Sequence, residues 1–164
     1  MLNWRTQQKV FMKTTNGAYI VDSLGKLLIL HPNNHPMNIW SIPKGLFDEG
    51  ETDSKDAAIR ETLEETNINL VLFQNKTKYE ELGVFKYSDK KKQLHAHLFH
   101  IDLPLSEMDL YLECKSMYED TKTKEFFPEC DIALWSDYEY ASLNLHYSQR
   151  KFLEKIKHLL VSKK

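Results

Sequence analysis

Short apolar runs separated by turn residues dominate the first part of the chain. Residues 17–22 (GAYIVD) and 26–32 (KLLILHP) are two such runs, and Ser23–Gly25 between them is typical of a hairpin turn. An extended segment, IWSIPKG, follows at residues 39–45 and is bounded by proline and glycine. The pattern therefore predicts three extended segments before the first helix.

The apolar period changes to that of a helix at residues 54–66 and again at residues 147–160. Asp53 or Ser54 is suited to cap the first of these helices at its amino end. Asn67 follows the same helix where a left-handed residue is favoured, and Asn tolerates that conformation.

The remaining runs predict a second group of strands. Strands are expected at residues 69–73, 79–87, 93–103 and 132–135, with a hairpin tip at 88–92 and a loop at 121–131. No repeat, linker or low-complexity tract divides the chain. The order of elements predicts one mixed α/β domain over residues 1–164, with strands on both sides of a central acidic helix.

Composition narrows the class of protein. The chain is 41% apolar and 28% charged, with a net charge of −2, so nothing marks it as a general binder of nucleic acids or membrane surfaces. Cys114 and Cys130 form no metal-type pair, and two such thiols indicate a reducing compartment. The amino-terminal segment lacks the apolar core of a signal peptide, and no run is long enough to span a membrane. A cytoplasmic protein is expected.

The helix at residues 54–66 carries a cluster of acids on one face. At about 100° per residue, Glu61, Glu64 and Glu65 fall within about 100° of each other. The apolar side is expected to carry Ala58, Ile59, Thr62, Leu63 and Thr66. Like charges at this spacing destabilise a helix, and only one arginine, Arg60, flanks them. Carboxylates clustered without basic partners suit a hard cation such as Mg²⁺ or Mn²⁺, although a solvated charged face is the simpler interpretation.

The loop before the helix favours the metal interpretation. Gly45 and Gly50 allow unusual backbone angles, so that a main-chain carbonyl can approach a cation closely. Glu51 is placed to turn back toward Arg60 and brace the loop against the helix. Lys44 adds a positive charge, as a phosphate bound beside the cation would require.

The stretch from Lys44 to Ile68 resembles the Nudix box, G-x5-E-x7-R-E-U-x-E-E-x-G-U, in which U is aliphatic. The matching residues are, in order, Gly45, Glu51, Arg60, Glu61, Glu64, Glu65 and Ile68. Three positions depart from the pattern, because Thr62 replaces an aliphatic residue, Asn67 replaces Gly, and eight residues instead of seven separate the first Glu from the Arg. None of these changes removes a carboxylate. The strand order also resembles the α/β/α sandwich of the family over most of the chain.

This resemblance implies a hydrolase that cleaves a phosphoanhydride bond in a nucleoside diphosphate linked to another group. The cofactor would be Mg²⁺ or Mn²⁺, which neutralises phosphate oxygens and activates water. The residues implied to hold the metal are Glu61, Glu64, Glu65 and the carbonyl of Gly45. Glu51 and Arg60 would pair as structural support.

Many members of the family use a further acid from a late loop. The run FFPECDIALW resembles the P-E-F-D-x-x-x-W run of RNA pyrophosphohydrolase relatives, which implies that Glu129 is a further metal ligand and catalytic residue. Glu125 is the alternative, and either carboxylate could instead be a solvated loop residue.

Two further resemblances favour a dinucleoside polyphosphate as the substrate. WSIPKG resembles the W-x-x-P-K-G of the diadenosine tetraphosphate hydrolase branch, and FKYSDKKKQLHAHLF resembles the strand of that branch in which a Tyr stacks on adenine. They imply base stacking by Tyr87 and phosphate contacts by Lys44 and by Lys90 or Lys92. A hairpin tip with solvated lysines is the competing interpretation.

Several alternatives stay open at this point. Within the family, the substrate could be an RNA 5′ end, ADP-ribose or a coenzyme. A Nudix nucleotide-binding module without turnover is a different class, although such modules often lose acids of the box, and none is lost here. A structural cation on the acidic helix is a further alternative. The leaving group, the number of metals and the oligomeric state are not determined by the sequence.

Overall fold

The computed structural model describes residues 12–88 and 91–162. Its centre is a six-stranded mixed sheet in the order β4–β5–β1–β2–β8, with β3 paired to β1. The strands of this sheet are β1 (Lys13–Val21), β2 (Leu27–Pro32), β3 (Lys44–Leu46), β4 (Thr77–Lys86), β5 (Lys92–Ile101) and β8 (Cys130–Ser136). β1 and β5 run parallel, and the other pairs are antiparallel. The predicted hairpin of the first two apolar runs is present as β1 and β2.

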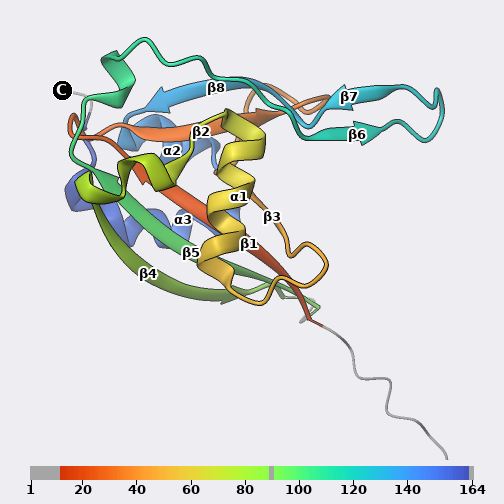
Figure 1. Cartoon of the computed structure of the whole chain (residues 1–164), viewed down its shortest axis with the longest axis horizontal. Coiled ribbons are helices and arrows are strands. Elements are labelled where there is room, and N and C mark those ends of the chain that lie inside the picture. The colour runs from red at the N-terminus through yellow and green to blue at the C-terminus, as the bar shows by residue number, and fades with distance from the viewer. Residues whose placement is uncertain (1–11, 89–90, 163–164) are drawn as a thin grey trace, which may run out of the picture.

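Helices cover both faces of the sheet. α1 (Ser54–Thr66) lies across one face, and α2 (Tyr138–Asn144) and α3 (Tyr147–Ile156) cover the other (Figure 1). The predicted α/β/α sandwich is therefore confirmed. Among the described residues, no helix has the length and apolar content needed to cross a bilayer.

β1 contributes side chains to both layers of the core, because successive side chains of a strand point to opposite faces of the sheet. Ala18 and Ile20 are fully buried in the cluster that includes Ala58 of α1. Tyr19 and Val21 are fully buried in the cluster that includes residues of α3. β1 thus lies at the centre of the molecule, where it can carry residues toward either helical layer.

α1 begins and ends where the sequence predicts. The side chain of Asp53 accepts a hydrogen bond from the N–H of Asp56 at 2.9 Å, which caps the first turn. Asn67 adopts the left-handed conformation with φ of 68°, and its N–H donates to the carbonyl of Leu63. These two caps determine which residues the helix presents to β3.

Residues 69–73 do not form the predicted strand. A 3₁₀ helix at Leu70–Lys76 takes their place, and the side chain of Asn69 accepts from the N–H of Val71 at 3.1 Å. Local bonds of this kind compete with sheet pairing. Leu70 is buried and Phe73 packs against the same core cluster, whereas Val71 and Leu72 are exposed, so the run packs with the three-residue spacing of a 3₁₀ helix rather than by a strand face.

The predicted loop at residues 121–131 contains a strand. β6 (Met117–Glu119) and β7 (Phe126–Pro128) pair in a small antiparallel hairpin that projects from the body beyond β8 (Figure 1). The ring centroids of Tyr118 and Phe127 in this hairpin lie 5.9 Å apart. The residues are too few for their pattern to predict a strand. α2 is also an element that the pattern does not predict.

Candidate active site on the acidic face of α1

Two of the three acids on α1 are buried. Glu61 is 8% exposed and Glu65 is 5% exposed, whereas the side chain of Glu64 is 40% exposed. The expectation that the acids lie opposite the packed side is therefore wrong, and Leu63, expected on the apolar side, is 38% exposed. The cause is β3, which packs over the acidic face of α1. A helical wheel cannot show such a cover.

Gly45 of β3 lies directly against the carboxylate of Glu61. A methyl group added at Gly45 would lie 2.1 Å from the carboxyl carbon of Glu61, closer than atoms can approach. The backbone of Gly45 does not have a positive φ, so the predicted unusual angle is wrong there and correct only for Gly50, with φ of 84°. Gly45 is required because the carboxylate occupies the space of a side chain.

Glu65 lies against the main chain of β3 and against a thiol. The N–H of Lys44 donates to Oε1 of Glu65 at 3.4 Å, and the thiol of Cys130 donates to Oε2 at 3.6 Å. Burial raises the pKa of Glu65 well above its usual value, and the negative charge of Glu61 raises it further. Burial also raises the pKa of Glu61. The site therefore holds two desolvated carboxylates that repel each other.

The two cysteines are free thiols that line one cavity beside Glu65. A hydrogen bond from Cys130 lowers the pKa of the Cys114 thiol to about 6, and the same bond raises the pKa of Cys130. Both thiols therefore lie next to the buried acid Glu65, and their separation in the sequence gives no sign of this contact.

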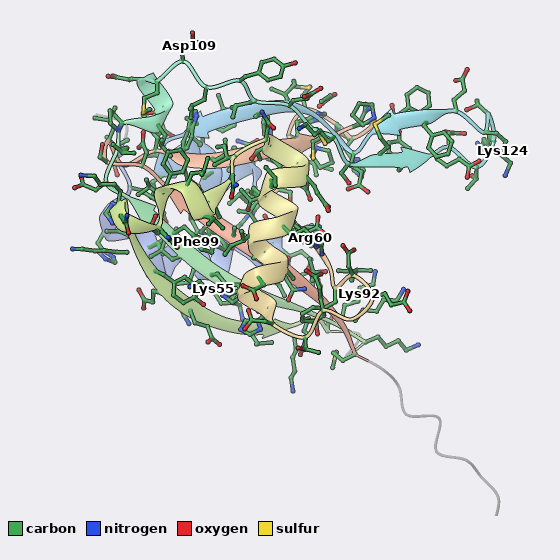
Figure 2. The ribbon with its side chains drawn as sticks, in the orientation of Figure 1. Lys55, Arg60, Lys92, Phe99, Asp109 and Lys124 are labelled. Carbon is green, nitrogen blue, oxygen red and sulfur yellow. The ribbon has the colours of Figure 1, made fainter. Side chains whose placement is uncertain are left out.

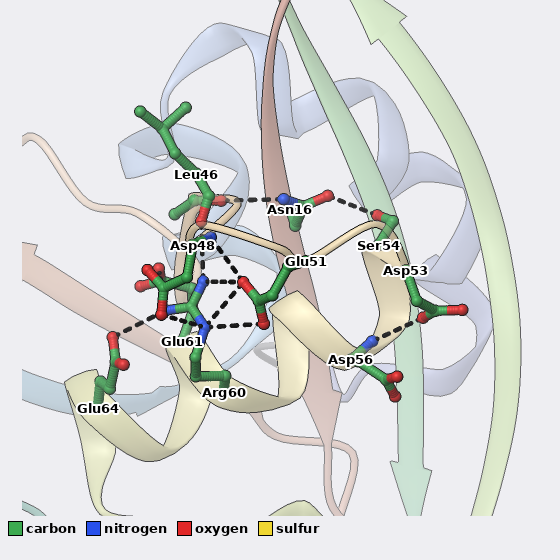
Figure 3. A network of polar contacts seen from close by, with 11 residues as sticks. Asn16, Leu46, Asp48, Glu51, Asp53, Ser54, Asp56, Arg60, Glu61 and Glu64 are labelled. Carbon is green, nitrogen blue, oxygen red and sulfur yellow. Dashed lines mark hydrogen bonds and ion pairs between the residues drawn. The ribbon is translucent and has the colours of Figure 1, made fainter.

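Arg60 uses every N–H of its guanidinium within the site (Figure 3). Nε donates to Glu51 at 3.0 Å, and Nη1 donates to Glu61 at 2.8 Å and to Glu64 at 3.1 Å. Nη2 donates to Glu51 and to the carbonyl of Leu46, both at 2.8 Å. The pairing of Glu51 with Arg60 is thus present despite the extra residue. The expectation that the acids have no basic partner is wrong, because Arg60 contacts two of them.

Arg60→Gln is expected to lower the thermal stability, because four carboxylates, those of Asp48, Glu51, Glu61 and Glu64, lose a shared partner. The side chain of Arg60 is 21% exposed. For a partly buried network we expect a loss of about 1–3 kcal/mol and a fall in melting temperature of about 2–12 °C. Thermal melts without divalent cations measure this. Unchanged melting together with weaker phosphate affinity would instead make Arg60 a substrate ligand.

Glu51→Gln tests the same pairing from the side of the carboxylate. The hydrogen bond from Arg60 lowers the pKa of Glu51. A lowered pKa in the folded state stabilises the protein above the ordinary Glu value of about 4.3, and the contribution is lost as pH falls through the lowered value. Glu51→Gln should therefore lose stability at neutral pH and match the wild type in acid.

A cleft of about 360 Å³ opens beside the carboxylates, between β3 and the start of the β6–β7 region. Glu61 and Glu129 both line it, and the charge of Glu129 contributes to the raised pKa values of Glu61 and Glu65. Glu125 lies elsewhere, at the turn of the β6–β7 hairpin next to Lys124, whose side chain marks its far end (Figure 2). Of the two late acids, the fold brings Glu129 to the cleft.

An aromatic group lies on the α3 side of the sheet. It consists of Phe85, Tyr87, His146 and Tyr147, whose neighbouring ring centroids are 4.5–6.4 Å apart. Burial lowers the pKa of His146 and the charge of Lys44 lowers it further, while the same charge opposes the raised pKa of Glu65. Lys44, which lines the cleft together with Glu61, is therefore close enough to both the carboxylates and His146 for its charge to act on each.

The predicted phosphate contact Lys92 is the first residue of β5 and is exposed. The N–H of Tyr87 donates to the carbonyl of Lys92 at 2.9 Å, and Leu94 is the partner of Thr15 in β1. Paired residues share a face of a sheet, so Leu94 lies on the same face as Thr15, which lines the cleft. Lys92 is two residues from Leu94 on the same strand, so it lies on this face too. Tyr87 is opposite Lys92 and shares the face with it. Lys90 lies outside the described residues.

Comparison with protein families decides the class of this site. Residues 13–155 match the family model described as the NUDIX domain. The chain belongs to the Nudix family. Membership places it among the Nudix hydrolases, and Nudix enzymes generally use divalent metal ions. The residues that match the Nudix box lie on β3, on α1, in the loop between them and just after α1.

Similar proteins support this assignment. A 17.7 kDa protein of the e-segB intergenic region of Enterobacteria phage T4 is 39% identical over 131 residues, which cover 76% of this chain and 82% of that protein. Nucleoside diphosphate-linked moiety X motif 6 of Xenopus laevis is 37% identical over 121 residues, 74% of this chain but 48% of that protein, so the chain spans about half of this relative. The structure of a C. elegans Ap4A hydrolase in a binary complex matches with a TM-score of 0.62 and 23% sequence identity. The matched region covers 90% of this chain and 96% of the hydrolase chain. The last likeness shows a shared fold.

The donor set of this Nudix site fits a divalent cation. Carboxylate and carbonyl oxygens are the ligands that hard cations prefer, and the desolvated pair Glu61 and Glu65 would be stabilised by added positive charge. In residues 12–88 and 91–162, no three Asp, Glu, His or Cys side chains are already gathered as a ligand set. Carboxylates now bonded to Arg60 would therefore have to turn toward a bound ion.

Several residues of the Nudix site carry no signal in the sequence. Thr15 and Ser116 line the cleft, His146 and Tyr147 complete the aromatic group, and Asn16 contacts the carbonyl of Gly45. They come from β1, from the N-cap and first residue of α3, and from the loop before β6, far from the box in the sequence. Among them, Asn16 has one sequence feature that could have indicated a special role, because it is a polar residue directly before the apolar run at residues 17–22.

Proposed function

We propose that the chain hydrolyses a phosphoanhydride bond in a dinucleoside polyphosphate, with Mg²⁺ or Mn²⁺ as the cofactor. The observation that carries this proposal is that Lys44 lines the cleft with Glu61, bonds Glu65 through its N–H, and carries a charge that also acts on His146 of the aromatic group. A nucleotide presents its features in the same order, because its phosphates need positive charge and its base needs an aromatic surface. The resemblance of WSIPKG to the diadenosine tetraphosphate hydrolase branch supports the choice of substrate.

The proposed roles follow from the positions of the residues. We assign the cation site to Glu61, Glu64, Glu65, Glu129 and the carbonyl of Gly45. Divalent cations there would neutralise phosphate oxygens and activate water for attack. Lys44 would contact phosphate oxygens beyond the cation site. Glu51 and Arg60 would hold the loop after β3 against α1, so that the Gly45 carbonyl keeps its position.

The base is proposed to rest on the aromatic group. Tyr147 is 54% exposed, and the hydroxyl of Tyr87 lies 3.1 Å from Oγ of Ser148, which orients its ring. Lys92 lies on the same face as Tyr87, so phosphates that extend beyond Lys44 would meet it. Lys90 is proposed as a second phosphate contact from the sequence alone.

A substrate panel tests the proposal directly. Diadenosine tetraphosphate, ADP-ribose and 5′-triphosphorylated RNA are incubated with the protein and Mg²⁺, and the products are separated by chromatography. We expect cleavage of the dinucleotide, and no turnover when the cation is chelated. Release of pyrophosphate from RNA without cleavage of dinucleotides would move the chain to the RNA branch. Tight binding of nucleotides without any turnover would make it a binding module.

Tyr87→Leu is expected to raise the Michaelis constant for a base-dependent substrate by about 5- to 150-fold, since aromatic stacking contributes about 1–3 kcal/mol. Leu retains apolar volume for the core, and the turnover number should change much less because the ring is remote from the carboxylates. Tyr87→Phe is the matched control, which keeps the ring and removes the contact with Ser148. An unchanged Michaelis constant in Tyr87→Leu would remove the stacking role.

A further inference from the structure

A chain of four side-chain hydrogen bonds connects β4 to the carbonyl of Gly45. The hydroxyl of Tyr79 lies 2.8 Å from Nδ1 of His97, and Nε2 of His97 lies 2.7 Å from Oγ of Ser54. Oγ of Ser54 lies 2.7 Å from Oδ1 of Asn16, and Nδ2 of Asn16 lies 3.3 Å from the carbonyl oxygen of Gly45. Figure 3 shows Asn16 between Ser54 at the start of α1 and the main chain of β3.

The four hydrogen bonds of this series can be donated in only one direction, from Tyr79 toward Gly45. The carbonyl of Gly45 only accepts, so Asn16 must present its NH₂ to it and its Oδ1 to Ser54. The single hydroxyl proton of Ser54 must then go to Asn16, and Oγ accepts from Nε2–H of His97. A neutral His97 with its proton on Nε2 accepts at Nδ1 from the hydroxyl of Tyr79. Every bond therefore donates toward Gly45.

Burial favours this arrangement. Asn16 is 0% exposed and His97 is 2% exposed, so an unmade bond in either residue would not be replaced by water. Burial, assisted by the neighbouring His95, lowers the pKa of His97 to about 4, which keeps the ring neutral at physiological pH. A buried network in which every member is satisfied specifies one geometry.

The two carbonyls of β3 next to the acids each receive a side-chain donor. Asn16 donates to the carbonyl of Gly45, and Arg60 donates to that of Leu46 at 2.8 Å. Asn16 and Gly45 are also direct partners in the pairing of β1 with β3. The peptide groups of β3 are therefore oriented from two sides, by the hydrogen-bonded chain and by the arginine.

We propose that Asn16 is a positioning residue for the Gly45 carbonyl, and that Tyr79, His97 and Ser54 set the orientation of its amide. This inference rests on the proposed function only in treating that carbonyl as a cation ligand. Partners that orient a ligand typically change metal affinity by about 10- to 100-fold when they are removed. Asn16→Leu, which has a similar size and no donor, should therefore raise the Mn²⁺ dissociation constant about 10-fold.

The hydrogen-bonded chain itself is tested in the metal-free protein by NMR. Gly45–Leu46 is the only Gly–Leu step in the sequence, so carbonyl-¹³C glycine combined with ¹⁵N leucine isolates the Gly45 carbonyl as a single signal. We expect the substitution Asn16→Leu to change the chemical shift of this signal. In the wild type, we expect the nitrogen chemical shifts of His97 to report the Nε2–H form. Tyr79→Phe should weaken the preference of His97 for that form. An unchanged Gly45 signal in Asn16→Leu, or an Nδ1–H form of His97, would show that these four hydrogen bonds are not arranged as proposed.

Mn²⁺ titration followed by electron paramagnetic resonance then tests the positioning role. Gln93→Leu is the control, because its amide bonds Thr14 of β1 at 2.9 Å and has no contact with Gly45. It should leave both the Gly45 signal and Mn²⁺ affinity unchanged. Unchanged or tighter Mn²⁺ binding by Asn16→Leu would overturn the positioning role. If the wild type itself bound no Mn²⁺, the cation site of the proposed function would fail, while the NMR result on the chain would stand.

Ser54→Ala provides a second route if Asn16→Leu does not fold. It interrupts the same chain at the start of α1 and leaves the core residue Asn16 in place. The Gly45 signal should move in the same direction and Mn²⁺ affinity should fall. Wild-type values for both would overturn the proposal.

Discussion

Glu65→Gln is expected to reduce turnover by about 100-fold or more while leaving the fold intact. Gln keeps the shape of the side chain and can still accept the hydrogen bond that the N–H of Lys44 donates. It removes a negative charge from the proposed cation site. Steady-state kinetics over a range of Mg²⁺ concentrations, with whichever substrate the panel identifies, measure the loss. Near-wild-type turnover in the folded variant would contradict the cation site.

The same variant should be more stable than the wild type at neutral pH when no cation is present. Burial and the charge of Glu61 raise the pKa of Glu65 in the folded state. A raised pKa stabilises the protein below the unfolded value of about 4.3, and this contribution is lost as pH rises through the folded value. Gln does not titrate. The gap in melting temperature should therefore widen from acid to neutral pH, and a constant gap would count against the desolvated carboxylate.

Gly45→Ala is expected to lower turnover by about 100-fold, since displacing a reacting group by about 1 Å can have that effect. The new Cβ would lie 2.1 Å from the carboxyl carbon of Glu61. Because the backbone of Gly45 has no positive φ, Ala is tolerated there, and the carboxylate of Glu61 must move instead. Thermal melts should change little, while turnover and Mn²⁺ affinity should both fall.

Gly50→Ala is the matched control. Gly50 has φ of 84° and open space around its Cβ position. Ala at this position strains the backbone by about 1–2 kcal/mol but contacts no carboxylate. We expect Gly50→Ala to lose stability and keep its turnover, the reverse of Gly45→Ala. Equal losses of activity in both variants would show that the loop, rather than the contact with Glu61, determines the result.

Features that depend on neighbours in the sequence could be predicted from it. The bounds of α1 follow from Asp53 and Asn67, because capping involves residues within one turn of the helix end. The pairing of Arg60 with Glu51 follows from a spacing that one helix and one loop can close. The family could also be identified, because the charged positions of its box all lie within a stretch of 24 residues, 45–68.

Features that depend on a distant partner could not be predicted. Residues 69–73 have the composition of a strand, but β4 begins only at Thr77 and occupies the edge of the sheet beside β5. The resemblance of FFPECDIALW favours Glu129 over Glu125, but no spacing in the sequence places either acid near α1, and it is the course of β7 and β8 that brings Glu129 to the cleft. An apolar pattern indicates how a segment can pack, but not which edge is available to it.

The sequence by itself thus determined the sandwich and the acidic helix, and it predicted the set of oxygen ligands that we propose for the cation. Only the tertiary structure decided which acids are desolvated, why Gly45 lacks a side chain, and that Asn16 contacts its carbonyl. Glu61 and Glu65 are buried because β3 packs over α1, and β3 is oriented by β1. Burial and pKa shifts depend on all atoms near a group, and these atoms come from segments that are far apart along the chain.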